Sequence, residues 1–152
     1  MLVRGEHFPD IADHILMHYD KQYSDPTAIK DGDIVYCDTH HLMKYVDVLN
    51  TKKDLVLITH NSDGFLTSDL SRVPMRHDSV DVNQFKGCYR YWFGQNNLVD
   101  PYYAQEAPIE SIPIGFENRR WDRGGEKEFI LNNIKQISTH KDMYFNCNIL
   151  TN

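Results

Sequence analysis

Four polar segments of the sequence carry residue types that bind hydroxyl groups and transfer protons. Each follows an apolar run and combines carboxylates, histidines or amides with small residues. The candidate residues are Asp38 and His40 after the first run, His60, Asn61, Ser62 and Asp63 after the second, Gln95 and Asn96 after the third, and Gly115, Glu117 and Asn118 after the fourth. Amides donate and accept hydrogen bonds, and carboxylates accept them from paired hydroxyls. This chemistry favours a carbohydrate ligand over a bare phosphate.

Proton transfer separates these candidates into two roles. A hydroxyl group that attacks an electrophile must lose its proton, and a nearby general base assists this step. Asp63, His60 and Asp38 are the candidate catalytic residues, and Asp63 is preferred because it follows the most apolar run. The remaining candidates are assigned to substrate binding, with His40 also the second choice as base. Residues 60–64 and 95–97 are equally typical of plain polar turns, so a purely structural role stays open.

The spacing of apolar residues predicts the elements that position these side chains. Strands are expected at 34–37, 54–59, 88–93, 111–115 and 143–149, and amphipathic helices at 9–20, 40–50 and 126–137. The apolar run at 54–59 is uninterrupted, as in a central parallel strand covered on both faces. The alternation predicts an α/β fold with a mostly parallel, Rossmann-like sheet flanked by helices. In such sheets ligands bind at the carboxyl ends of strands, near a reversal of strand order.

Composition limits the classes of partner. The 152 residues carry a net charge of −6 with no cluster of basic residues, so nucleic acid is not an expected partner. No apolar stretch is long enough for a membrane span. The cysteines Cys37, Cys88 and Cys147 are scattered within apolar runs, which favours three buried thiols over disulfides. Without a signal-peptide pattern, these features predict a single soluble, cytoplasmic domain over residues 1–152.

Beyond these patterns, the sequence resembles a known family in the order of its motifs. The segments LVLITHNSDG, YWFGQN, SIPIGFEN and MYFNCNILTN are similar to those of exostosin-like and viral-type glycosyltransferases with a two-lobed, GT-B-like organisation. The resemblance covers about residues 31–152. It implies transfer of a sugar from a nucleotide-sugar donor to a hydroxyl of a carbohydrate or glycosylated acceptor. It also implies that the chain is the N-terminal, acceptor-side lobe, with 142–152 at the crossing to a second lobe.

The resemblance leaves alternatives open because the sequence lacks a Gly-rich phosphate loop and the late basic residues that hold the diphosphate in such enzymes. The donor is therefore expected to bind through a second lobe, and no cofactor is expected in this one. A glycan-binding module without catalysis is the first alternative. A metal-dependent phosphohydrolase is the second, because Asp38 and His40 followed by Asn61 and Asp63 are faintly similar to metallophosphoesterase elements. No metal ligand is assigned.

Overall fold

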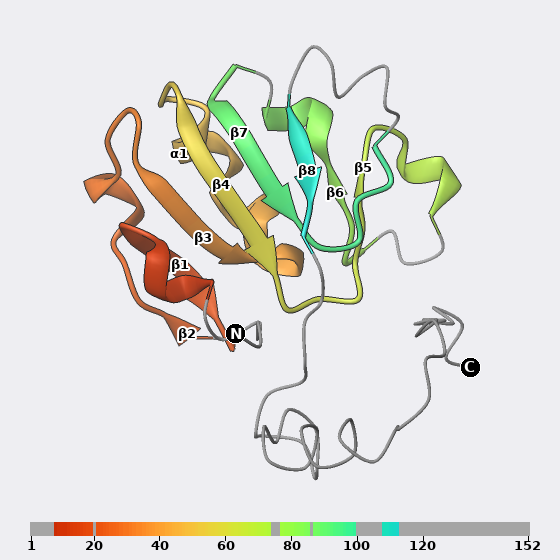
Figure 1. Cartoon of the computed structure of the whole chain (residues 1–152), viewed down its shortest axis with the longest axis horizontal. Coiled ribbons are helices and arrows are strands. Elements are labelled where there is room, and N and C mark those ends of the chain that lie inside the picture. Colours follow the sequence, from red (N-terminus) through yellow and green to blue (C-terminus); the bar gives the residue numbers. More distant parts are fainter. Residues whose placement is uncertain (1–7, 20, 74–76, 86, 100–107, 113–152) are drawn as a thin grey trace, which may run out of the picture.

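A parallel sheet organises the structure, a computed structural model that describes residues 8–19, 21–73, 77–85, 87–99 and 108–112 (Figure 1). Its strand order is β2-β1-β3-β4-β7-β8. The strands are β1 (His14–His18), β2 (Lys21–Gln22), β3 (Ile34–Asp38), β4 (Leu55–His60), β7 (Tyr89–Gly94) and β8 (Ile109–Ser111). All neighbours pair in parallel except β2, which pairs antiparallel with β1. The predicted mostly parallel α/β sheet is thus confirmed.

One face of the sheet forms the hydrophobic core. Val35, Leu57, Trp92 and Ile109 lie in one register row across β3, β4, β7 and β8, and all four belong to the buried core cluster. Because side chains alternate along a strand, residues of one row project from the same face. The strand predicted at 54–59 is confirmed as β4, which lies between β3 and β7.

A glycine turn sets the start of β3. Gly32 has φ +85°, a left-handed conformation that costs glycine little. The flanking carboxylates fix this turn, since Asp31 accepts a hydrogen bond from the Lys53 amide (2.9 Å) and Asp33 from the Lys30 amide (2.7 Å). The turn therefore anchors the amino ends of both β3 and β4.

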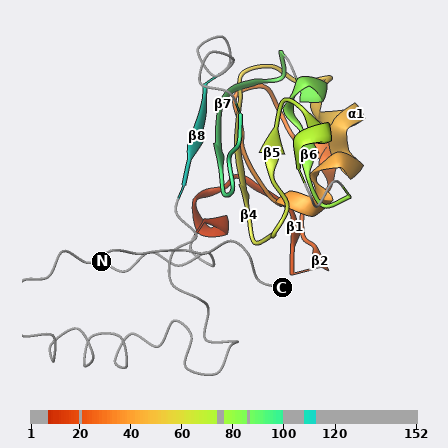
Figure 2. The ribbon, with the colours of Figure 1, turned by 90° about the vertical axis from the view of Figure 1, so that its right-hand side faces the viewer.

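The connections that join β3 to β4 and β4 to β7 cover the core face. The first contains a 3-10 helix η4 (Thr39–Tyr45) and α1 (Val46–Leu49), so the helix predicted at 40–50 is confirmed as helical but is mostly 3-10. The second contains β5 (Leu66–Thr67), η5 (Leu70–Arg72), β6 (Val80–Asp81) and η6 (Val82–Phe85). Figure 2 shows α1, β5 and β6 on the same side of the sheet.

The helix predicted at 9–20 is wrong. A short 3-10 turn, η2 (Pro9–Ile11), precedes β1 instead. Ile11 is 61% exposed, whereas Leu16 is completely buried, which is not the burial that the four-residue spacing predicted. The apolar run of β1 has only three residues between two histidines, and its backbone pairs with β3. Tertiary pairing has overridden the local helical pattern.

Two further features of the sheet differ from expectation or lie outside the described residues. The parallel strands β1, β3, β4, β7 and β8 follow chain order, so the described part of the sheet has no reversal of strand order. The strand predicted at 111–115 overlaps β8 only at Ser111. The helix predicted at 126–137, the strand at 143–149 and the crossing at 142–152 lie outside the described residues. Helices on both faces, as in a Rossmann-like fold, are not found among the described elements.

Candidate functional site

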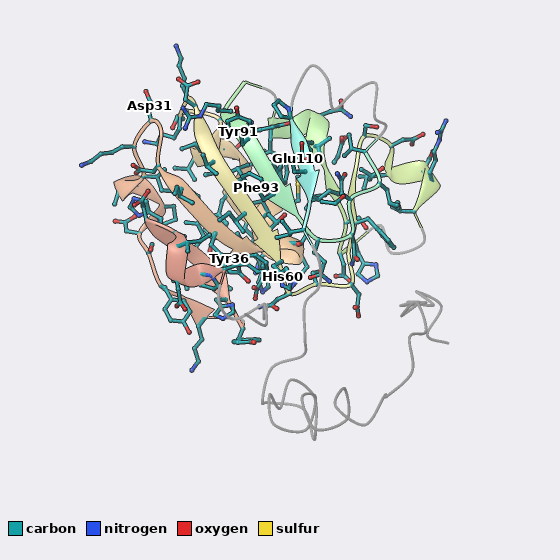
Figure 3. All side chains as sticks on the ribbon, viewed as in Figure 1. Asp31, Tyr36, His60, Tyr91, Phe93 and Glu110 are labelled. Carbon is teal, nitrogen blue, oxygen red and sulfur yellow. The ribbon has the colours of Figure 1, made fainter. Side chains whose placement is uncertain are left out.

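The carboxyl ends of β1, β3 and β4 bring buried polar side chains together at one edge of the sheet. Asp38 ends β3 and His60 ends β4, and the two are register partners. Both are almost fully buried, with 1% and 2% of their surface exposed. Figure 3 shows His60 and Tyr36 near this edge. Burial of two ionisable residues side by side requires hydrogen-bond partners, which the neighbouring strands provide.

Asp38 is the centre of this polar cluster. Its carboxylate accepts hydrogen bonds from the Tyr19 amide (2.7 Å) and from the Tyr36 hydroxyl (3.0 Å), and it lies 3.4 Å from Nδ1 of His18. Asp38 stands at the N-cap position of η4, yet its side chain makes no capping hydrogen bond. The carboxylate therefore makes its hydrogen bonds with residues of β1, of the turn after β1, and of β3. It makes none with the helix that follows.

The His18 ring stands between a hydrogen-bond acceptor and a donor. Its Nδ1 lies 3.4 Å from Oδ1 of Asp38 and 3.2 Å from Nδ2 of Asn61. In one neutral tautomer Nδ1–H donates to Asp38, and in the other Nδ1 accepts from Asn61. Nε2 makes no hydrogen bond within the described residues, and the side chain is 12% exposed. His18 thus has one nitrogen bound to the cluster, and its other nitrogen has no hydrogen-bond partner among the described residues.

Asn61 links the ends of three strands. Its side-chain amide donates to the Tyr36 hydroxyl (3.1 Å), and its Oδ1 lies 3.1 Å from Nδ1 of His60. Its backbone amide donates to Oε1 of Gln95 (3.1 Å), which follows β7. One residue therefore connects β1, β3 and β7 to the end of β4.

Two amides hold the loop that follows β4. Gln95 donates from Nε2 to the carbonyl of Ser62 (3.1 Å), and Asn96 donates to the same carbonyl (3.1 Å). The Ser62 hydroxyl accepts from the Gly64 amide (3.0 Å). The side chains of Ser62, Gln95 and Asn96 were predicted to orient a ligand. In the structure they hydrogen-bond to backbone groups and fix the loop beside the cluster.

Left-handed backbone conformations gather at this edge. Tyr19, Asn61 and Asn96 have φ of +48°, +55° and +53°, and each follows the end of a different strand. Asparagine adopts this conformation readily, whereas a tyrosine rarely does. At Tyr19 the conformation accompanies the 2.7 Å hydrogen bond from its amide to Asp38. The contact with the carboxylate offsets the conformational strain.

Burial fixes the protonation state of Tyr36. Desolvation raises the pKa of its hydroxyl far above the ordinary value, and the nearby Asp38 carboxylate raises it further. The hydroxyl therefore remains protonated and donates to Asp38. The same two causes raise the pKa of the adjacent Cys37 thiol, which keeps it neutral.

The other predicted site residues are placed differently. Asp63 is exposed in the loop after β4 and makes no hydrogen bond to the cluster within the described residues. His40 is half-buried in η4, with its ring 3.9 Å from that of His41. Gly115, Glu117 and Asn118 lie outside the described residues. The structure thus brings Asp38, His60 and Asn61 together and leaves Asp63 at the surface.

Sequence analysis missed His18 and Tyr36. His18 falls within the helix predicted at 9–20, which separates it from the strand-end residues, and Tyr36 falls within the strand predicted at 34–37 without being a candidate for the site. The signal that could have placed His18 is the shortness of the run Ile15-Leu16-Met17, because strands are typically shorter than helices. A second strand next to β3 would then have brought His18 to the same edge.

Other features of the described residues do not point to a competing site. A hollow of about 380 Å³ lies away from the cluster, lined by Thr67, Ser68, Asp69, Arg72, Val73, Leu98 and Val99. The described residues contain no group of three or more His, Cys, Asp or Glu that could hold a metal ion, and no helix among them could span a membrane. Comparison with protein-family models, curated proteins and solved structures found no match for this chain.

Proposed function

We propose that the chain is the acceptor-side lobe of a two-lobed, GT-B-like glycosyltransferase. The cluster at the carboxyl ends of β1, β3 and β4 then binds the sugar acceptor. The observation that carries the proposal is the contact of the buried Asp38 carboxylate with Nδ1 of His18, whose Nε2 makes no hydrogen bond within the described residues. The parallel sheet supports it because ligands bind at this edge in α/β proteins. The order of the sequence motifs supplies the reaction class.

In this proposal His18 is the general base, acting through Nε2. The tautomer whose Nδ1–H donates to Asp38 leaves a lone pair on Nε2. This lone pair accepts the proton of the acceptor hydroxyl. At the same time the hydroxyl oxygen attacks the anomeric carbon of the donor sugar. The nucleoside diphosphate leaves with the electron pair of the broken glycosidic bond. Asp38 is a positioning residue that holds the tautomer and stabilises the imidazolium that forms.

Asp63 remains the competing base because an exposed carboxylate in the loop after β4 can reach an acceptor bound further out. The two candidate bases differ in the hydrogen-bond partners that hold them in place. In the tautomer that leaves Nε2 free to accept a proton, the Asp38 carboxylate orients His18, whereas no partner within the described residues orients Asp63. Positioning is a large part of what a catalytic group contributes, so His18 is the better-supported base.

The proposal is tested by incubating the full chain with nucleotide sugars and a glycan array, with binding and transfer scored separately. We expect glycans to bind the wild type and binding to fall about fivefold in His18→Ala, the loss of about 1 kcal/mol for one hydrogen bond. Asp63→Asn should bind normally. Failure of any glycan to bind would contradict the proposal. Binding without transfer, even when the second lobe is supplied, would instead identify a glycan-binding module.

A further inference from the structure

The ring nitrogen Nδ1 of His18 lies beside two side chains that require opposite protonation states of it. Oδ1 of the Asp38 carboxylate, at 3.4 Å, can accept a hydrogen bond only from a protonated Nδ1. Nδ2 of Asn61, at 3.2 Å, can donate a hydrogen bond only to an unprotonated Nδ1. The two contacts therefore cannot be hydrogen bonds at the same time. Each neutral tautomer of His18 makes one of them and breaks the other.

The orientation of the Asn61 amide follows from the buried hydroxyl of Tyr36. This hydroxyl has one hydrogen and donates it to the Asp38 carboxylate (3.0 Å), since a hydrogen bond to a charged acceptor is the stronger one. The Tyr36 oxygen then accepts a hydrogen bond from Asn61, so the amide atom that lies 3.1 Å from it is the nitrogen. The other amide atom, Oδ1, lies 3.1 Å from Nδ1 of His60. His60 therefore carries a proton on Nδ1, which donates to this oxygen.

Further contacts hold both His18 and Asn61 in place. Asn61 has φ +55°, and its backbone amide donates to Oε1 of Gln95 (3.1 Å), which fixes the direction in which its side chain leaves the backbone. The centroid of the His18 ring lies 4.1 Å from that of Tyr19 and 5.4 Å from that of Tyr36. A half-turn of the His18 ring would put a carbon where Nδ1 lies and would lose both of its polar contacts. Asn61 and Asp38 therefore compete for one fixed nitrogen.

We propose that Asn61 is a positioning residue that competes with Asp38 for Nδ1 of His18 and so divides the ring between two tautomers. The tautomer bonded to Asp38 has a lone pair on Nε2 and can accept a proton there. The tautomer bonded to Asn61 has its proton on Nε2 and can only donate it. Asn61 thus keeps a fraction of the protein in a form that cannot act as a base. This bearing on catalysis rests on the proposed function, whereas the tautomer ratio is a property of the chain without a ligand.

The test replaces Asn61 by glycine, which removes the competing amide and adopts a φ of +55° without strain. ¹⁵N chemical shifts of the His18 ring are measured on the full chain without ligand, in the plateau at high pH where the ring is neutral. We expect the ratio of the Nδ1–H to the Nε2–H tautomer to rise about fivefold, the effect of losing one ordinary hydrogen bond. Asn96→Gly is the matched control, because Asn96 has φ +53° and its amide donates to the carbonyls of Ser62 and Gly64.

The wild type alone can already contradict the proposal, whether or not the variants fold. Its spectra should show a mixture of both tautomers at His18 and a proton on Nδ1 of His60. A single tautomer at His18, or a neutral His60 with its proton on Nε2, would overturn the proposal. So would an unchanged ratio in folded Asn61→Gly, or an equal rise in Asn96→Gly, which would trace the change to a loosened loop after β4. Glycan binding is measured separately, so the failure of the proposed function is distinguished from the failure of this inference.

Discussion

The position of Asp38 explains much of the local chemistry. A buried carboxylate needs several donors, and Tyr19, Tyr36 and His18 supply them from two strands. The backbone of Tyr19 turns left-handed where its amide meets the carboxylate, and Tyr36 stays protonated because burial raises its pKa. Sequence analysis identified Asp38 from its place after an apolar run. It could not identify the donors, because strand pairing between distant segments selects them.

Replacing Asp38 by Asn tests its role in positioning His18. The amide can no longer accept a hydrogen bond as strongly from Nδ1–H, so His18 should shift to the tautomer that accepts from Asn61. ¹⁵N chemical shifts of the ring report the tautomer directly. If the proposed transfer reaction is reconstituted, its rate should fall about 100-fold or more, the usual contribution of a general base. Asp63→Asn removes the competing base and should leave the His18 tautomer unchanged, which makes it the control for the tautomer measurement. An unchanged His18 tautomer in Asp38→Asn would remove Asp38 from the mechanism.

The two described cysteines should be unreactive in the folded protein. Burial raises the pKa of Cys88 to about 11, and burial together with Asp38 raises the pKa of Cys37. Because the folded-state pKa is raised, the thiols ionise more readily in the unfolded chain, and their effect on stability becomes unfavourable as the pH rises toward 11. Alkylation at pH near 8, mapped by mass spectrometry, should be slow at both residues until the protein unfolds. Rapid native-state modification would contradict their burial.

The segment that contains β1 shows where the spacing of apolar residues fails to predict secondary structure. Ile11, Ile15 and Tyr19 have helical spacing, yet residues 14–18 form a strand because their backbone pairs with β3. The strands at β3, β4 and β7 were predicted correctly, since each has a longer β-rich run that no helical pattern contests. The error at β1 removed His18 from the candidate site. One wrong secondary-structure prediction therefore also changed the set of residues considered for the candidate site.

Two alanine substitutions distinguish the strand from the predicted helix. Leu16 is completely buried, so Leu16→Ala should lower the free energy of unfolding by about 2–5 kcal/mol. Ile11 is exposed, and Ile11→Ala should change it by about 0.5 kcal/mol or less. Denaturant unfolding of both variants measures the difference. A large loss at Ile11 with a small one at Leu16 would favour the helix.

The hydrogen bond from Trp92 Nε1 to Thr59 Oγ1 (2.9 Å) links β7 to β4 within the core. Thr59→Val leaves the indole donor buried without its acceptor, which should cost about 1–3 kcal/mol of unfolding free energy. Adding Trp92→Phe removes the donor as well, so the two losses should not add. A double-mutant cycle measures this coupling, expected at about 0.5 kcal/mol or more. Simple additivity would mean that the bond does not contribute.

The order of the strands determines where a ligand can bind. Five parallel strands in chain order place their carboxyl ends at one edge and their described crossovers on one face (Figure 1). The sequence predicted the class of fold and the edge, because both depend on apolar runs and the residues after them. It could not predict the strand order, since this depends on which strands pair.

The most direct test of the account locates the ligand. Amide and ring resonances of the full chain are followed by NMR while a saccharide that binds on the array is added. The account predicts that the largest shifts occur at His18, Tyr19 and Asn61, at the carboxyl edge of the sheet, and that they weaken in His18→Ala. Shifts confined to the hollow lined by Arg72 and Leu98 would place the ligand elsewhere. That result would contradict the assignment of the polar cluster as the acceptor site.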